Sequence, residues 1–194
     1  MTTDVTTIVS GLPRSGTSLM MQMIHSGGLP ALTDEMRAGD EDNPRGYFEL
    51  EAVKKIRTDT SWLDDTPGRV VKMVHLLLYD LPGARSYRVV FMTRDLGEVV
   101  RSQGVMLQRR GTTGAALTPG QLVKAYESQL AKIRQWLDEQ RNFEVHYTSY
   151  NDLMADPPTV AAAVNAFLGG GLDVDAMLRN VDPKLYRQRQ ALST

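Results

Sequence analysis

GLPRSGTS, residues 11–18, stands between an apolar β-branched run at residues 5–9 and a second apolar run that begins at Leu19. A strand, a glycine-containing loop and a helix in this order bring backbone N–H groups together at the helix N-terminus, where an anion binds. Arg14 adds a guanidinium, and three neighbouring hydroxyl side chains add further donors: Ser15, Thr17 and Ser18. The stretch therefore predicts a phosphate or sulfate site.

The rest of the chain alternates short β-branched runs with longer amphipathic runs, which is the pattern of a parallel sheet covered by helices on both faces. Strands are predicted at residues 5–10, 69–74, 87–93 and 143–148, and helices at residues 17–26, 51–60, 96–108, 119–140 and 159–168. In the helix at 119–140, an apolar stripe from Leu122 to Leu137 is expected to face the sheet. We expect one α/β domain over residues 1–194.

The composition argues against several classes of protein. With 22 basic and 23 acidic side chains, the chain lacks the positive balance of a nucleic-acid-binding protein. It contains no cysteine and three scattered histidines, so neither a disulfide nor a metal site is expected. No apolar stretch approaches the roughly 20 residues that span a bilayer, and the first residues lack the basic region of a secretory signal. We expect a cytoplasmic protein without a membrane span, and no pattern indicates an oligomeric state.

A second motif, FMTRDLGEVVRSQ at residues 91–103, places Arg94 directly after a predicted strand and Ser102 eight residues later on the next helix. That spacing is a little over two helical turns, so both side chains can face one phosphate. A third segment, HYTSYNDLMADP at residues 146–157, has Tyr150 just after a late predicted strand.

These three segments resemble the family of sulfotransferases that use 3′-phosphoadenosine 5′-phosphosulfate (PAPS) as donor. The Pro-Arg-Ser-Gly-Thr form of the loop is similar to that of the tyrosylprotein branch and of small bacterial members. The resemblance implies a P-loop NTPase-like three-layer fold and transfer of a sulfuryl group, with adenosine 3′,5′-bisphosphate (PAP) as product and no metal required. The acceptor would be a hydroxyl or an amine on a small molecule or a peptide.

The resemblance also implies roles for individual residues. Five loop residues would bind the sulfuryl group and the 5′-phosphate: Arg14, Ser15, Gly16, Thr17 and Ser18. Arg94 and Ser102 would bind the 3′-phosphate, and Tyr150 would contact the adenine side. The C-terminal Arg-Lys-Gly motif of the cytosolic animal enzymes is absent, which leaves Arg187 and Arg189 as candidates to complete the nucleotide pocket.

The reaction needs a base that takes the acceptor's proton as the new bond to sulfur forms. Glu35 is the first choice, because the catalytic glutamate of the tyrosylprotein branch follows the loop arginine at the separation of Glu35 from Arg14. Asp34 and Glu49 lie in the same acidic segment and stay open as alternatives. His75 is the rival, since it follows a strand in a segment that resembles the Lys-Thr-His of cytosolic members with one extra residue.

Two other functions stay open beside sulfuryl transfer. One is a P-loop small-molecule kinase that uses ATP and magnesium, and the other is a nucleotide-binding module without catalysis. Against the kinase, Thr17 stands where a nucleotide kinase carries its lysine, and Arg94 would oppose a metal ion held near Asp95. A sulfuryl group carries less negative charge than a terminal phosphoryl group, so fixed donors can stabilise its transfer without a metal.

Overall fold

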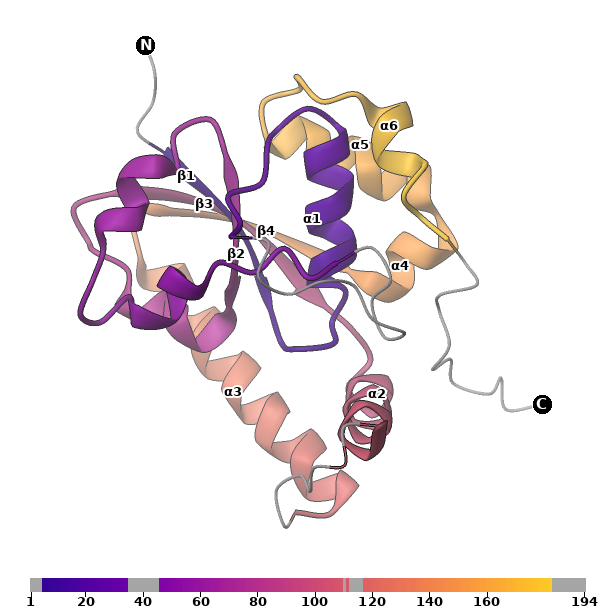
Figure 1. The fold of residues 1–194 in the computed structure, drawn as a ribbon. Helices are drawn as coiled ribbons and strands as arrows, with labels where there is room; N and C mark the ends of the chain where they lie inside the picture. The colour runs from indigo at the N-terminus through magenta and orange to yellow at the C-terminus, as the bar shows by residue number, and fades with distance from the viewer. Residues whose placement is uncertain (1–4, 35–45, 110, 112–116, 183–194) are drawn as a thin grey trace.

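The computed structural model describes residues 5–34, 46–109, 111 and 117–182. Four parallel strands form one sheet in the order β2–β1–β3–β4 (Figure 1). They are β1 (Val5–Gly11), β2 (Val70–Val74), β3 (Ser86–Thr93) and β4 (Phe143–Ser149). The predicted α/β fold with a central parallel sheet is confirmed, and every strand lies within one residue of its predicted bounds.

Helices cover both faces of this sheet (Figure 1). One face carries α1 (Thr17–Ser26), α4 (Tyr150–Ala155), α5 (Pro157–Phe167) and α6 (Val174–Leu178). The other face carries α3 (Pro119–Glu139) and three 3₁₀ turns, η1 (Glu51–Lys55), η2 (Ser61–Asp65) and η3 (His75–Asp80). The remaining helix, α2 (Leu96–Arg109), packs against α3.

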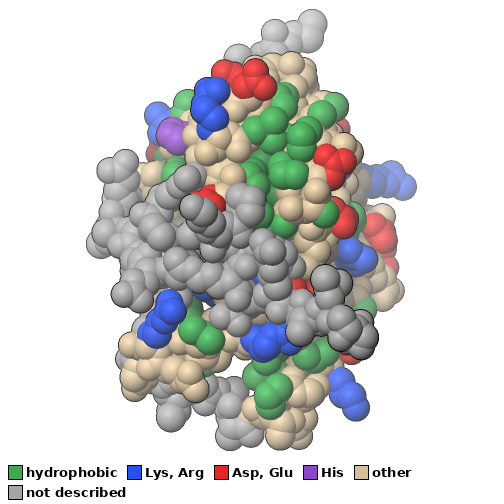
Figure 2. Space-filling view, turned by 90° about the vertical axis from the view of Figure 1, so that its right-hand side faces the viewer, with side chains coloured by type: hydrophobic (Ala, Val, Ile, Leu, Met, Phe, Trp, Pro, Cys, Tyr) green, Lys and Arg blue, Asp and Glu red, His purple; other side chains and the backbone are tan. Residues whose placement is uncertain are grey.

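Side chains on successive strand residues enter two hydrophobic clusters, one on each face of the sheet. Ile8 and Phe91 lie in the cluster beneath α3, whereas Val9 and Met92 lie in the cluster beneath α1. Helices α5 and α6 contribute both buried and partly buried side chains to the second cluster, and Figure 2 shows hydrophobic side chains gathered over the upper part of that face of the molecule. The sheet is thus rigidly packed on both sides, which fixes the positions of the loops at its carboxyl edge.

The carboxyl end of β1 is the point at which the connections of the sheet diverge. β1 lies between β2 and β3, and its last residue, Gly11, pairs with Val74 and Met92. The helix that follows β1 covers one face, whereas α3, which lies between β3 and β4 in the chain, covers the other. In open α/β sheets, ligands bind in the crevice at such a switch point. The fold therefore puts the loop at residues 12–16 where a ligand site is expected.

Two details of the sequence-based prediction are wrong. The predicted helix at 51–60 is a 3₁₀ turn that ends at Lys55, because Thr58 Oγ1 donates to the Lys55 carbonyl (3.1 Å) and the Asp59 carboxylate accepts from the Ser61 N–H (2.9 Å). Such local side-chain bonds compete with the backbone bonds of a helix. The apolar stripe of α3 faces the sheet only in its second half, since Tyr126 donates to Gln103 of α2 (2.5 Å) instead.

Helices α4 and α6 were not predicted, and each begins at a residue whose side chain caps it. Ser149 Oγ accepts from the Asp152 N–H (3.2 Å), and the Asp173 carboxylate accepts from the Ala176 N–H (2.9 Å). Among the described residues, none of the helices combines the length and the apolar character that a bilayer crossing requires.

Candidate functional site

The loop after β1 is held by its own hydrogen bonds. Ser15 is buried, and both its N–H (3.2 Å) and its hydroxyl (2.7 Å) donate to the Leu12 carbonyl. Arg14 adopts a left-handed backbone conformation with φ of 71°, which is strained for a residue with a side chain. The loop therefore presents Arg14 at its outer bend in a conformation that the surrounding contacts have to maintain.

The end of the loop is a glycine in a crowded place. Gly16 has φ of 96° and precedes α1, whose N-terminus has no side-chain cap among the described residues. A Cβ atom at this position would lie 2.4 Å from Cδ2 of Tyr150, the first residue of α4. The aromatic ring thus packs directly against the backbone that leads into the first turn of α1, where N–H groups and the helix dipole favour an anion.

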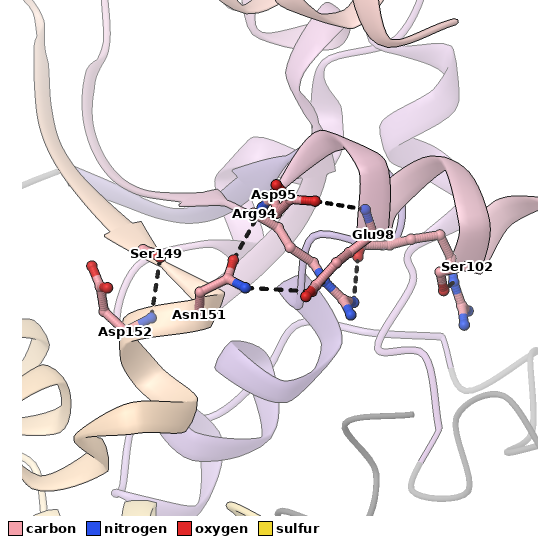
Figure 3. A network of polar contacts seen from close by, with 8 residues as sticks. Arg94, Asp95, Glu98, Ser102, Ser149, Asn151 and Asp152 are labelled. Carbon is pink, nitrogen blue, oxygen red and sulfur yellow. Dashed lines mark hydrogen bonds and ion pairs between the residues drawn. The ribbon is translucent and has the colours of Figure 1, made fainter. Parts of the chain in front are cut away.

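Arg94 lies directly after β3, and its side chain is 8% exposed. Its Nε donates to Oε2 of Glu98 (2.9 Å), and its Nη1 donates to the carbonyl of Arg14 (3.1 Å). The guanidinium also lies over the Tyr150 ring, 4.4 Å from the ring centre. Figure 3 shows this side chain running from the end of β3 along the first turns of α2, beside Glu98.

Ser102 of α2 is buried, and its hydroxyl oxygen accepts a hydrogen bond from Nε of Arg14 (2.9 Å). The loop arginine is therefore tied to α2 through its side chain and to Arg94 through its carbonyl. The structure brings together the two arginines, Ser102, Gly16 and Tyr150 from three separate parts of the chain.

On the other side of the loop, β2 contributes Lys72. Its Nζ lies 3.4 Å from the hydroxyl of Ser18 in α1 and 3.7 Å from the Glu49 carboxylate, and it donates to the carbonyl of Tyr47. The Lys72 side chain is 12% exposed and that of Glu49 is 27% exposed. The Lys72 ammonium and the Glu49 carboxylate therefore lie beside the first turn of α1. Thr17, at the start of the helix, is half-buried.

His75 starts η3 at the carboxyl end of β2, and only 2% of its surface is exposed. Its Nε2 is hydrogen-bonded to Oε1 of Gln129 in α3 (3.3 Å). Burial lowers the pKa of His75 below its ordinary value of 6.5, and the bond to Gln129 only partly offsets that effect. The lowered pKa favours the neutral imidazole of His75, which joins the end of β2 to α3 through its bond to Gln129.

The other candidate bases differ in what they contact. Asp34 accepts a hydrogen bond from the Glu51 N–H (2.6 Å) and so joins the segment before the acidic stretch to the one after it. Glu35 lies outside the described residues, as do Arg187 and Arg189.

Asp95, the acid after β3, accepts from the Glu98 N–H (2.8 Å) and caps α2. The described residues contain no group of three or more His, Cys, Asp or Glu side chains with the spacing of a metal site.

Sequence reasoning missed three side chains in this region. Glu98 stands four residues after Arg94, which lies just before the helix, and that spacing between opposite charges was a signal for their contact. Gln129 and Asn151 gave no signal, because their partners come from other elements of the fold.

Comparisons with known proteins give a family match and several similar folds. A model of the sulfotransferase domain matches residues 4–188. The search of curated proteins gave no match. The sulfotransferase domain from the Synechococcus PCC 7002 olefin synthase is 16% identical with a TM-score of 0.57, and the alignment covers 99% of this chain and 90% of that one. The likeness confirms the P-loop NTPase-like three-layer fold.

Two further solved structures are similar at the same level. The sulfotransferase domain from the curacin biosynthetic pathway is 15% identical with a TM-score of 0.51, and the alignment covers 96% of this chain and 78% of that chain. Retinol dehydratase in complex with androsterone and the inactive cofactor PAP is 16% identical with a TM-score of 0.54. That alignment covers 95% of this chain and 64% of the dehydratase.

Proposed function

Because this chain belongs to the sulfotransferase domain family, we propose that it moves a sulfuryl group from PAPS to a hydroxyl or amine acceptor and releases PAP. The extent of the family match also supports the proposal that residues 1–194 form a single domain. The observation that carries the proposal is the meeting of Arg14, Arg94 and Ser102 beside the N-terminus of α1. A ribose that bears phosphates at both its 3′ and 5′ positions needs two adjoining anion sites of this kind.

In this proposal, the loop and the first turn of α1 bind the 5′ side of the donor. Arg14 and Thr17 hold the sulfuryl and bridging oxygens, while the N–H groups at Gly16 and Ser18 hold the 5′-phosphate. A guanidinium and fixed N–H donors stabilise charge where it develops during transfer, which is commonly the main source of an enzyme's rate enhancement. The Ser15 hydroxyl bonds to the Leu12 carbonyl, so its described contact is within the loop itself.

Arg94 and Ser102 are proposed to bind the 3′-phosphate, with Tyr150 on the adenine side. Both polar side chains are buried and lie against Arg14, so a phosphate bound there would share the arginine that contacts the 5′ side. The Tyr150 ring is held between the Arg94 guanidinium and Gly16, which fixes the orientation of a flat surface beside the site.

We assign the proton-accepting base to a carboxylate. His75 is buried and bonded to Gln129, and these contacts favour a structural role for it. Glu35 stays the first choice on the resemblance to the tyrosylprotein branch, and Glu49 is the alternative among the described residues, because it stands beside Lys72 and Ser18. The acceptor oxygen bonds to sulfur, the bond from sulfur to the bridging oxygen breaks, and the acceptor's proton passes to the carboxylate.

The acceptor is proposed to be a small molecule with an apolar body. Val74 and Leu76 are 43% and 47% exposed at the carboxyl end of β2, on either side of His75, so two large hydrophobic side chains are accessible at this edge of the sheet. Retinol dehydratase, of the same fold, has been solved with androsterone. A screen of phenols, apolar alcohols, sugars and tyrosine peptides with labelled donor tests this assignment, and exclusive use of sugars would contradict it.

Calorimetry separates the proposed function from its alternatives. We expect the protein to bind PAP without magnesium and to bind ATP with magnesium much more weakly. The opposite order would favour a kinase, although Asp95 already serves as the cap of α2. Binding of PAP without transfer to any acceptor would indicate a nucleotide-binding module.

A further inference from the structure

Glu98 is a buried carboxylate, 1% exposed, that has no part in the proposed reaction. Burying a charge is unfavourable unless it is paired and hydrogen-bonded, so a carboxylate in this place calls for a physical explanation. We propose that Glu98 is a positioning residue for the nucleotide site, which orients Arg94 for the 3′-phosphate and for the loop. The inference rests on the proposed function, because it needs a 3′-phosphate at Arg94.

Two side-chain contacts of Glu98 meet at one oxygen atom. Oε2 accepts from Nε of Arg94 (2.9 Å) and from Nδ2 of Asn151 (3.4 Å). Figure 3 shows the side chains of Arg94, Glu98 and Asn151 meeting from the end of β3, from α2 and from α4. A hydrogen-bonded ion pair with both side chains under 10% exposed is screened little by solvent, so its geometry is well defined.

The carboxylate is itself fixed from two directions. Asn151 Oδ1 accepts from the Asp95 N–H (3.0 Å), which orients the amide group that donates to Glu98. The Asp95 carboxylate accepts from the Glu98 N–H (2.8 Å), which fixes the start of α2. Asp95, Glu98 and Asn151 form a hydrogen-bonded frame that joins the ends of β3 and β4. These two strands pair continuously up to Thr93 and Ser149.

Arg94 transmits this position to the loop. With Nε held by Glu98, the guanidinium presents Nη1 to the carbonyl of Arg14, the residue with φ of 71°. The Tyr150 ring supports the face of the same guanidinium. Glu98 thus acts on the nucleotide site through Arg94, and its loss would release one of three described restraints on that side chain.

The test compares two nucleotides that differ in the 3′-phosphate alone. Affinities of PAP and of adenosine 5′-phosphate are measured by calorimetry for the wild type, Glu98→Ala and Glu98→Gln. We expect Glu98→Ala to weaken PAP binding about 10-fold, on the order of 1.4 kcal/mol, and to leave adenosine 5′-phosphate within about two-fold. Glu98→Gln keeps an oxygen that can accept from Arg94, so its loss should be smaller.

A double-mutant cycle with Arg94→Gln identifies the route. In the Arg94→Gln background, Glu98→Ala should change PAP binding by less than about two-fold, because the side chain that it positions is gone. Glu144→Ala is the matched control, since Glu144 accepts from Arg88 Nε at 3.1 Å in an exposed pair. It should leave both affinities unchanged.

Equal losses for the two nucleotides, no loss at all, or the same loss in the Arg94→Gln background would each overturn the inference. Should Glu98→Ala fail to fold, as judged by thermal unfolding, Glu98→Gln decides with the same ligands: a loss for PAP alone supports the role, and equal or absent losses refute it. A wild-type protein that binds the two nucleotides equally would overturn the proposed function and this inference with it.

Discussion

Gly16→Ala is the substitution whose cost the structure predicts most directly. The new Cβ would lie 2.4 Å from Cδ2 and 3.2 Å from two further ring atoms of Tyr150. The residue would also keep φ of 96°, which an alanine adopts only with strain. The strain costs roughly 1–2 kcal/mol, and displacing the ring from its packed position costs roughly 1–3 kcal/mol more.

Gly28→Ala separates the two contributions. Gly28 follows α1, has φ of 112°, and has no described atom within 4 Å of an added Cβ, so its substitution carries the strain without the steric clash. Unfolding in urea should therefore show Gly16→Ala less stable than Gly28→Ala by roughly 1–3 kcal/mol, equivalent to about 2–12 °C in melting temperature for a chain of this size.

Ligand binding provides the second measurement. Gly16→Ala should weaken PAP binding at least about 10-fold, because the clash between the new Cβ and the Tyr150 ring shifts the backbone at the N-terminus of α1. Gly28→Ala should bind PAP like the wild type. In a Tyr150→Ala background, Gly16→Ala should cost no more than Gly28→Ala does. Equal stabilities of the two glycine variants would refute the steric argument.

The remaining predictions concern the reaction and its pH dependence. Arg14→Ala should lower turnover on the order of 100-fold, and near-normal turnover would contradict the role of Arg14. The control is Arg88→Ala, which removes an arginine paired with Glu144 at the other end of the sheet and should leave turnover unchanged. Of Glu35→Gln and Glu49→Gln, the variant that loses turnover but keeps PAP affinity identifies the base, and retained turnover in both would leave Asp34 or His75 as the base. Because burial lowers the pKa of His75 below 6.5, the unfolded chain binds the proton first as pH falls, so stability should decline below about pH 6.5. His75→Asn should flatten the urea-derived stability curve between about pH 6.5 and 5, and an unchanged slope would contradict this account.

The elements built from local pattern were predictable from the sequence. β-branched runs located all four strands, and the bounds predicted for α1 are those observed. The helix predicted at 51–60 was wrong because Thr58 and Asp59 form local hydrogen bonds that a hydrophobic pattern does not reveal. Tyr150 was singled out for the adenine side, which stays a prediction, and the helix that starts with it was missed despite the capping serine before it.

The sequence motifs indicated several residues that the structure brings together, whereas they did not indicate the mutual contacts of those residues. The motifs indicated that Arg94 and Ser102 could lie near one anion, and the structure places both against Arg14. The bond from Arg14 to Ser102 and the frame of Glu98 and Asn151 depend on how α2 and α4 pack at the sheet edge. Such packing arises from tertiary structure, which spacing within one segment does not report.

The order in which the chain is made has a consequence for the loop. Arg14 finds its polar partners 80 and 88 residues further along, and Gly16 meets its aromatic neighbour in the last quarter of the polypeptide. During synthesis on the ribosome, the strained bend would lack the contacts to Arg94 and Ser102, and then the contact to Tyr150, until each of those residues has emerged. A nascent chain stalled before Tyr150 should therefore contain the complete GLPRSGTS stretch and still be unable to retain PAP.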